Sequence, residues 1–514
     1  MKYFVVKRTF LLGVDIKNRA GENINGPCYT SLMQIQVRWI TAVSLCLSLL
    51  VICASIATRT PWWDEGIYAD PAVSLVTNGR LGSIVLGEYV ELYRPYVHQY
   101  TYWISPFYPV AVAAIFKVFG VGVFSMRSFS LFCALLTLAA WFLIGKHLGN
   151  GRTIGLLASA VLALDFAFLQ QSANARPDAM VLGCGSAGLA AYLALRERNL
   201  ANALLAGGTL CALAVCTHPS GAIFVCDLLL LIGLLDRRRI RPVHALYALL
   251  PFVVIGIAWL SYILQAPEIF RAQFGNQIRF RASSHGSRVL ATITDFYHRY
   301  FFYYYSAQSG YRRLKIVGLV FYVAAFAGVL LRPGLRSREG VRAALVLAVA
   351  NYCLLANLDR QGFPLYLVTV FAPFALVSAI WIADALESGC ALRWVAVSLL
   401  AASWGVSVCG HGVKILANGY KNEFLPVIER VKPIVDRGGN IVAGSEIAFG
   451  VGFRSNVIDD LRLGSGLAAP PEAIVFNLYD LREPEPGSKA ALSGYQKVLS
   501  NPNFALYARR SRLR

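Results

Sequence analysis

The chain has 514 residues, of which 57% are hydrophobic and only 15% are charged. Soluble domains average about a quarter charged residues, so this composition excludes an ordinary soluble protein and requires apolar surface that faces lipid. The net charge of +20 would favour nucleic acid as a partner of a soluble protein. Here the basic residues lie mainly in short segments between apolar runs, which is typical of integral membrane proteins, and no nucleic-acid partner is expected.

The sequence predicts an all-α polytopic membrane bundle, because apolar runs near the ~20 residues that cross a bilayer recur along it. About eleven transmembrane helices are predicted, at residues 39–57, 124–144, 153–170, 179–195, 200–216, 220–235, 244–264, 314–331, 341–357, 365–386 and 392–410. The first run follows a long basic tail and is predicted to be a retained helix rather than a signal peptide. The run at 105–120 is short and contains two prolines and a lysine, which favours an interfacial helix.

The positive charges predict the orientation of the bundle. Basic residues concentrate in the loops that are inner if the N-terminus is inside, as in "DRRRIR" (236–241). The long outer loop at 265–313 is an exception, with seven arginines that could contact either anionic lipid head groups or a phosphate substrate. An odd number of spans places the C-terminal segment outside.

Three parts of the chain are predicted. Residues 1–38 form a cytoplasmic N-terminal tail, and residues 39–411 form the transmembrane domain. Residues 412–514 are more polar and are predicted to form a small outward-facing, periplasmic α/β domain. Its expected elements are a helix near Glu423–Asp436 and strands in "NIVAG", "SNVIDD", "EAIVFN" and "FALYAR".

Two acids follow the first span directly, in "TPWWDEGIYADPA" (60–72). Asp64 could cap a helix, which Pro71 would limit to a short one. Alternatively, an acid here could be a general base at the membrane surface, because acids at membrane depth are rare and usually functional. This motif alone leaves both interpretations of Asp64 and its neighbour Glu65 open.

A third acid, Asp178, lies in "SANARPDAM" at the outer end of the third span. An acid in the first turn of a helix that begins at Pro177 would stabilise the helix dipole. The adjacent Arg176 also suits a phosphate pocket, because arginine binds phosphate through paired donors. Asp165, near the outer end of its helix, could line the same cavity.

The aromatic run at 91–109 contains a single histidine, His98. Tyrosine and tryptophan at this depth usually form the interfacial aromatic belt, and stacking against a sugar is the alternative. A surface histidine is the default interpretation of His98, and a role in ligand binding is the functional one.

Four stretches, in this order and spacing, resemble the GT-C membrane glycosyltransferases: "WWDEGIYA", "SPFYPVAVAAIFKVFG", "LQQSANARPDAM" and "DRQGFPLYLVTVFAPFALVSA" (359–379). The likeness covers about residues 39–411. It is greatest to the branch of protein mannosyltransferases and aminoarabinose transferases, which take sugars from polyprenyl phosphates. The small C-terminal domain is similar to outer domains that some members carry.

The resemblance implies roles for individual residues. It makes Asp64 the catalytic base, and it makes Asp178 an assisting acid that orients the acceptor or holds a divalent metal. Glu65 would support the loop. Arg360 before Tyr366 would bind the lipid phosphate, although lysine is common at that position in the family, and Tyr366 would also contact the donor. In the family a charged residue often precedes the paired prolines, and the segment "WISPFYP" lacks it. The identity of the transferred sugar therefore stays open.

The predicted function is transfer of a single sugar from a polyprenyl-phosphate donor to a hydroxyl of a lipid, glycan or protein acceptor. Inversion at the anomeric carbon is expected from a single displacement. The enzyme would lie in the plasma or inner membrane among membrane lipids, with its active site facing the periplasm or exterior. The alternatives are a polytopic transporter or lipid flippase, and a non-catalytic GT-C relative, since fold does not guarantee chemistry.

Overall fold

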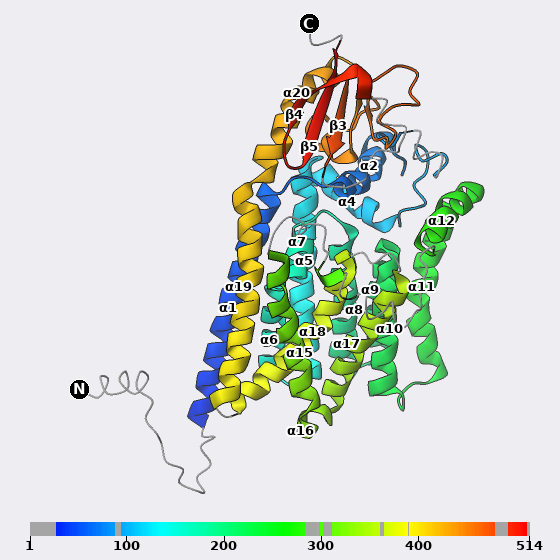
Figure 1. Cartoon of the computed structure of the whole chain (residues 1–514). Helices are drawn as coiled ribbons and strands as arrows, with labels where there is room; N and C mark the ends of the chain where they lie inside the picture. Colours follow the sequence, from blue (N-terminus) through cyan, green and yellow to red (C-terminus); the bar gives the residue numbers. More distant parts are fainter. Residues whose placement is uncertain are drawn as a thin grey trace.

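The computed structural model describes residues 27–87, 94–282, 296, 299–301, 311–359, 364–388, 390–478 and 492–510. Long helices form a bundle, and a small module that contains a β-sheet sits on one end of it (Figure 1). We call this end of the bundle the module end. The all-α membrane bundle with a small C-terminal α/β region, predicted from the sequence, is therefore confirmed.

The main helices of the bundle are α1 (Pro27–Thr58), α5 (Val123–Leu148), α8 (Pro177–Leu195), α9 (Leu200–Thr217), α11 (Pro242–Ile263), α15 (Ile316–Leu330), α17 (Glu339–Leu358), α18 (Leu367–Glu387), α19 (Cys390–Ala417) and α10 (Ala222–Leu231), which η2 extends. The other helical segments are α6 (Arg152–Ala163), α7 (Phe166–Ser172), η1 (Pro219–Gly221), η2 (Ile232–Asp236), α12 (Pro267–Ala282), α14 (Tyr311–Leu314), α16 (Pro333–Arg336) and η4 (Pro364–Tyr366). Each of the eleven predicted spans coincides with helical structure.

Two of those spans differ from the prediction in form. Within the described residues nine helices are long and apolar enough to cross a membrane, and the bent pair α6–α7 makes a tenth. This pair replaces the single helix predicted at 153–170 and bends by 71°. The bend follows from Asp165, whose Oδ1 accepts hydrogen bonds from the amides of Ala167 and Phe168 and so starts a new helix. The eleventh, α15, has only 15 residues.

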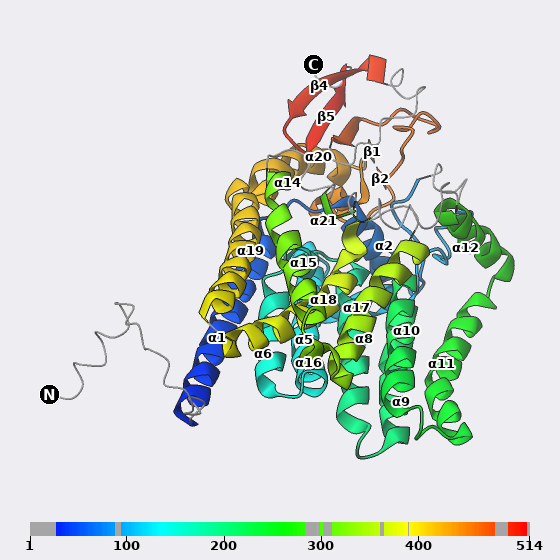
Figure 2. The same ribbon diagram turned by 60° about the horizontal axis from the view of Figure 1, so that its bottom comes forward.

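Burial differs strongly across the bundle. The most apolar window of α18 is 83% buried, whereas that of α11 is only 6% buried. A helix that is hydrophobic on all sides suits a core position when it is surrounded by helices and a lipid-facing position when it is not. In Figure 2, α18 lies inside the bundle and α11 stands at its edge.

Two short helices, α2 (Trp63–Asn78) and α4 (Phe107–Phe119), pack together between the bundle and the module. The short α4, with 13 residues, corresponds to the predicted interfacial helix at 105–120. The expectation that Pro71 would end the helix was wrong, because α2 continues through it to Asn78. Its buried face, which includes Ala69, Ala72 and Val73, packs against α4 and offsets the missing backbone hydrogen bond.

The helix α19 ends at Ala417, and a turn at Asn418, with a φ of 44°, separates it from the module. A π-helical turn η5 (Tyr420–Phe424) then leads directly into α20 (Leu425–Asp436). The boundary proposed at residue 412 therefore falls within α19. The sheet has the strand order β2-β1-β3-β5-β4. The strands are β1 (Ile441–Val442), β2 (Val457–Ile458), β3 (Ala473–Asn477), β4 (Tyr495–Ser500) and β5 (Phe504–Arg509), and the short helices are η6 (Ser445–Ile447), α21 (Ala448–Val451) and η7 (Leu492–Gly494).

The module rests on α2. The backbone of Ser445 lies so close to Gly66 that a Cβ atom at residue 66 would overlap it. The indole Nε1 of Trp63 donates a 2.6 Å hydrogen bond to Oδ2 of Asp459, and Leu86 forms a parallel bridge with Asp459. The helix that carries Asp64 and Glu65 is therefore fixed between the membrane bundle and the module.

Candidate active site

Arg176 joins the two acids that the sequence singles out. Its Nε donates a 2.8 Å hydrogen bond to Oδ2 of Asp178, and its Nη1 forms an ion pair with Oδ2 of Asp64. Asp64 comes from the first turn of α2, and Asp178 from the first turn of α8, which begins at Pro177. Two helix N-termini from distant parts of the chain thus meet at one guanidinium group at the module end.

The two carboxylates differ in exposure. The side chain of Asp64 is 23% exposed, whereas that of Asp178 is 3% exposed. Aromatic rings flank the guanidinium, with the Arg176 Cζ atom 4.9 Å from the ring centroid of Trp62 and 5.7 Å from that of Tyr68. Cation–π contacts of this kind help to fix an arginine. The geometry makes Asp64 the acid that an incoming molecule can reach, and Asp178 a buried support for Arg176.

Glu65 has a different environment from its neighbour. It is fully buried, and its two oxygens accept hydrogen bonds from Arg127 Nε at 2.8 Å, Arg127 Nη2 at 2.6 Å, Ala175 N at 2.7 Å and Trp62 N at 2.9 Å. Burial on its own raises the pKa of this carboxyl, but the charge and hydrogen bonds of Arg127 and the two amides hold the pKa below its usual value. Glu65, and not Asp64, satisfies the free amide at the start of α2.

Arg127 extends this support to the end of α1. It donates hydrogen bonds to the carbonyl oxygens of Ile56, Arg59 and Thr60 at 3.0 to 3.2 Å. The sequence analysis did not single out this residue. Its signal was a lone arginine inside an otherwise apolar run, since a charge within a membrane segment usually has a partner.

His98 belongs to a separate network around Asp70. Its Nδ1 lies 3.1 Å from the carbonyl oxygen of Ser83, and the Ser83 hydroxyl donates to Oδ2 of Asp70. The backbone amide of Ile84 donates to the other Asp70 oxygen at 2.8 Å. This network holds the segment after α2, and no contact in the described parts of the chain joins His98 to Asp64, Arg176 or Asp178.

Asp70 makes the stability of the protein depend on pH. Burial raises its pKa from 3.8 to about 6, although the hydrogen bonds from Ser83, Ile84 and Val85 act in the opposite direction. The folded state therefore binds more protons than the unfolded state between about pH 4 and pH 6. Over that range the free energy of unfolding should fall as the pH rises, by about 3 kcal/mol for this group. Melting temperatures at pH 4.5 and 7 should differ less in Asp70→Asn than in the wild type, and an equal difference in both would contradict this.

Tyr366 and Arg360 were both expected to bind the donor. Tyr366 is buried in η4, its hydroxyl lies 3.3 Å from Nε2 of His218, and Gln171 in α7 donates to the carbonyl oxygen of the adjacent Leu365 at 3.3 Å. Arg360 lies outside the described residues. Asp359, which precedes Arg360, accepts a 2.7 Å hydrogen bond from Arg299. Arg299, one of the seven arginines of the 265–313 loop, is therefore buried in an ion pair.

No group of three or more His, Cys, Asp or Glu side chains is placed to hold a metal ion in the described part of the chain. At the acid site, the guanidinium of Arg176 contacts both Asp64 and Asp178. Asp165, the other acid considered, caps α7 and also accepts a 2.8 Å hydrogen bond from the Tyr322 hydroxyl.

Part of the chain matches a known family, and its fold is similar to solved membrane proteins. Residues 104–262 match the family described as dolichyl-phosphate-mannose-protein mannosyltransferase. The structure is similar to that of ArnT from Cupriavidus metallidurans bound to undecaprenyl phosphate, with a TM-score of 0.60 at 15% identity, over 92% of this chain and 98% of that chain. It is also similar to the oligosaccharyltransferase of Archaeoglobus fulgidus in a complex with Zn and sulfate, with a TM-score of 0.54 at 14% identity, over 90% of this chain and 73% of that one.

A relative in sequence is an uncharacterized protein of Aquifex aeolicus (strain VF5). It is 26% identical over 115 residues, which are 22% of this chain and 21% of that protein, so the match spans about a fifth of the relative's length. The family match and the fold confirm the assignment made from the sequence motifs. The chain is a multi-pass membrane protein that shares the fold of these GT-C structures, and residues 104–262 match the mannosyltransferase family.

Proposed function

We propose that this protein transfers a single sugar from a polyprenyl phosphate to a hydroxyl group of a lipid, glycan or protein. The observation that supports this most is the contact of Asp64 and Asp178 with Arg176 at the module end of the bundle. A lipid-linked sugar keeps its chain in the bilayer and its sugar at the surface, so its chemistry belongs at this depth. A transporter site would instead be expected near the middle of the membrane.

In the proposed reaction, the hydroxyl oxygen of the acceptor attacks the anomeric carbon of the sugar, and Asp64 accepts the proton of that hydroxyl. The bond from that carbon to the phosphate oxygen breaks, and the polyprenyl phosphate leaves with the electron pair. A single displacement of this kind inverts the anomeric configuration. Arg176, which forms an ion pair with Asp64, carries the positive charge that stabilises the negative charge of the leaving phosphate.

Asp178 has a positioning role in this proposal. Its buried carboxylate holds the Nε side of the Arg176 guanidinium, so that the Nη side faces Asp64. Its other oxygen, Oδ1, accepts no hydrogen bond from any residue that the structure describes, which leaves an acceptor for a hydroxyl of a bound sugar or acceptor molecule. The proposal that the donor is a polyprenyl phosphate is supported by the ArnT structure with undecaprenyl phosphate.

Replacing Arg176 by lysine tests the arrangement. Lysine keeps the charge but cannot bond two carboxylates through one planar group, so we expect transfer to fall at least about tenfold, the effect of losing one good charge-assisted contact. The assay is sugar transfer by purified protein, with the product mass read by mass spectrometry of lipids and glycans. Arg198→Lys, an exposed residue before α9, is the matched control. Equal rates in both variants would contradict the role of Arg176.

The proposed orientation places the module on the outer side of the membrane. A reporter enzyme that is active only outside the cytoplasm should work when it is fused after Arg514. The same reporter inserted after Arg238, in the basic loop at 236–241, should be silent, because basic loops stay inside. The opposite pattern would place the candidate site on the inner face and remove the outward-facing function.

A further inference from the structure

A group of basic side chains surrounds Phe166 at the start of α7. The Nζ atoms of Lys315 and Lys414 lie 4.7 and 5.4 Å from the centroid of its ring, and the ring of His411 lies 5.0 Å from it. Arg59 is near enough to interact electrostatically with both Lys414 and His411. We call Arg59, Lys315, His411 and Lys414 the basic cluster; none of them touches Asp64 or Asp178 in any contact described above.

The cluster is assembled by elements that are distant in sequence. Arg59 follows α1, Lys315 precedes α15, and the other two residues lie on the last turns of α19. Arg59 is 9% exposed, Lys315 is 5% exposed, and the ammonium nitrogen of Lys414 is also buried. Bringing like charges together inside a membrane protein is unfavourable, and intramembrane charges usually mark a binding site or pathway. The cluster therefore suits an anion.

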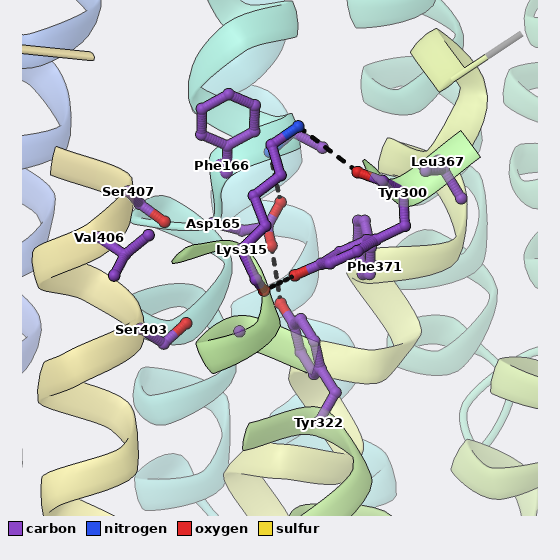
Figure 3. Close-up of a pocket in the computed structure, with 12 residues that line it drawn as sticks. Asp165, Phe166, Tyr300, Lys315, Tyr322, Leu367, Phe371, Ser403, Val406 and Ser407 are labelled. Atoms are coloured by element: carbon purple, nitrogen blue, oxygen red, sulfur yellow. Dashed lines mark hydrogen bonds between the residues drawn. The ribbon is translucent and has the colours of Figure 1, made fainter. Parts of the chain in front are cut away.

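Two cavities adjoin the cluster. The smaller, of about 40 Å³, is lined by Lys315, Phe166, Asp165 and Tyr322 among others, and Figure 3 shows the Lys315 side chain running along it towards Phe166. Asp165 is the one acid among its lining residues, and it is bonded to two backbone amides and to Tyr322. The carboxylate in this cavity is thus already bonded within the protein, and the cavity is too small for more than about one water molecule.

The larger cavity has a volume of about 190 Å³ and lies between the ends of α1 and α19 and the module. Arg59 and Lys414 line it, together with Thr60, Asn477 and Asn503. The carboxylate that also lines it, Glu423, accepts hydrogen bonds from Thr60 and Asn503. Because Thr60 and Asn503 donate to Glu423, the cations Arg59 and Lys414 are the lining groups that suit phosphate oxygens, to which arginine and lysine are typical donors.

The position of the larger cavity indicates the source of the anion. Thr58 and Ala417 are the last residues of two adjacent long apolar helices, so the cavity lies where the lipid phosphates of the module-side leaflet would be. Trp62 lines the cavity, and its ring also makes the cation–π contact with Arg176. The cavity is thus a neighbour of the acid site, in contact with it through one side chain.

We propose that the cavity between α1, α19 and the module binds the phosphate group of a lipid from the module-side leaflet, through Arg59 and Lys414. This site is distinct from the contact of Arg176 with Asp64 and Asp178, and it does not depend on the proposed sugar transfer. Two lipids carry the required chemistry, a bilayer phospholipid and a free polyprenyl phosphate. Both present a phosphate at this depth with apolar chains that extend along the bundle.

Native mass spectrometry of the purified full-length protein tests the site. The protein is delipidated in detergent and titrated with phosphatidylglycerol, with undecaprenyl phosphate, or with inorganic phosphate. We expect Lys414→Gln to weaken retention of one lipid at least about tenfold, and Lys414→Arg to retain it, since a charge-assisted contact to phosphate is lost in the first and kept in the second. Lys421→Gln, an exposed residue a few positions further along the chain, removes the same charge and should have no effect.

The arms of the titration distinguish the sources. Lys414-dependent retention of phosphatidylglycerol identifies a bilayer lipid, and retention of undecaprenyl phosphate alone identifies a carrier. Either supports the site, whatever the result of the transfer assays. Equal retention by wild type, Lys414→Gln and Arg59→Gln would overturn it, provided that each variant elutes as a single species. Binding of inorganic phosphate at the same affinity as the lipids would overturn the assignment to a lipid.

Discussion

Asp64→Asn is expected to lower the rate of sugar transfer at least roughly a hundredfold, the usual contribution of a positioned base. Asparagine has nearly the same shape as aspartate but cannot accept a proton. Because the side chain of Asp64 is partly exposed and caps no helix, the variant should fold and insert normally. The measurement is turnover of purified, monodisperse protein with a lipid-linked sugar donor.

The control for this variant is Asp436→Asn on α20, which makes the same chemical change at a side chain that is 43% exposed. It should transfer sugar at the wild-type rate. Asp178→Asn is informative as well: an intermediate loss would agree with a residue that acts through Arg176, and a loss as severe as that of Asp64→Asn would indicate that both acids hold a metal. Near wild-type turnover of Asp64→Asn would remove the base from the mechanism.

Glu65→Gln is expected to act on stability. The glutamate is buried and bonded to Arg127 at two positions, and removing one partner of a buried ion pair typically destabilises a protein by about 3 to 5 kcal/mol. The neutral amide would leave the Arg127 guanidinium without its counter-charge, and the NH₂ group would face the donor of Ala175 or Trp62. Thermal unfolding in detergent should show a clear fall in melting temperature.

The dependence of the melting temperature on pH supplies a second measurement for the pair of Glu65 and Arg127. The folded-state pKa of Glu65 lies below its usual value, so its stabilisation is present above that usual value and is lost as the pH falls below it. This loss should be missing in Glu65→Gln. Glu387→Gln, at an exposed position near the end of α18, is the matched control. An unchanged melting temperature together with lost turnover would make Glu65 a catalytic residue.

Much of the fold could be predicted from the sequence because lipid and core impose simple patterns. Apolar length located the helices of the bundle, and short apolar segments located β1, β2, β3 and β5. The strand β4 was missed. Among the described strands it lies at the edge of the sheet, next to β5, and its exposed Gln496 and Lys497 obscure the alternation by which a half-buried strand is recognised.

The site was predictable as a set of residues but not as a set of contacts. The positions of Asp64, Arg176 and Asp178 suggested function, yet nothing in the sequence showed that one guanidinium would contact both acids. The different environments of Asp64 and Glu65 follow from helix geometry, since successive residues point about 100° apart around the axis. One side chain therefore faces Arg176 and the other faces Arg127. Which one faces the core depends on packing between distant helices.

The close approach of Ser445 to Gly66 has a consequence for how this chain can change. The residue directly after the two acids must be glycine because backbone from the far end of the chain fills the space of any side chain. The short motif beside the first span and the C-terminal module are therefore interlocked parts. A chimera that received the module of a relative would need an incoming backbone with a matching hollow at this point. The two regions are bound to diverge together, although most of the polypeptide separates them.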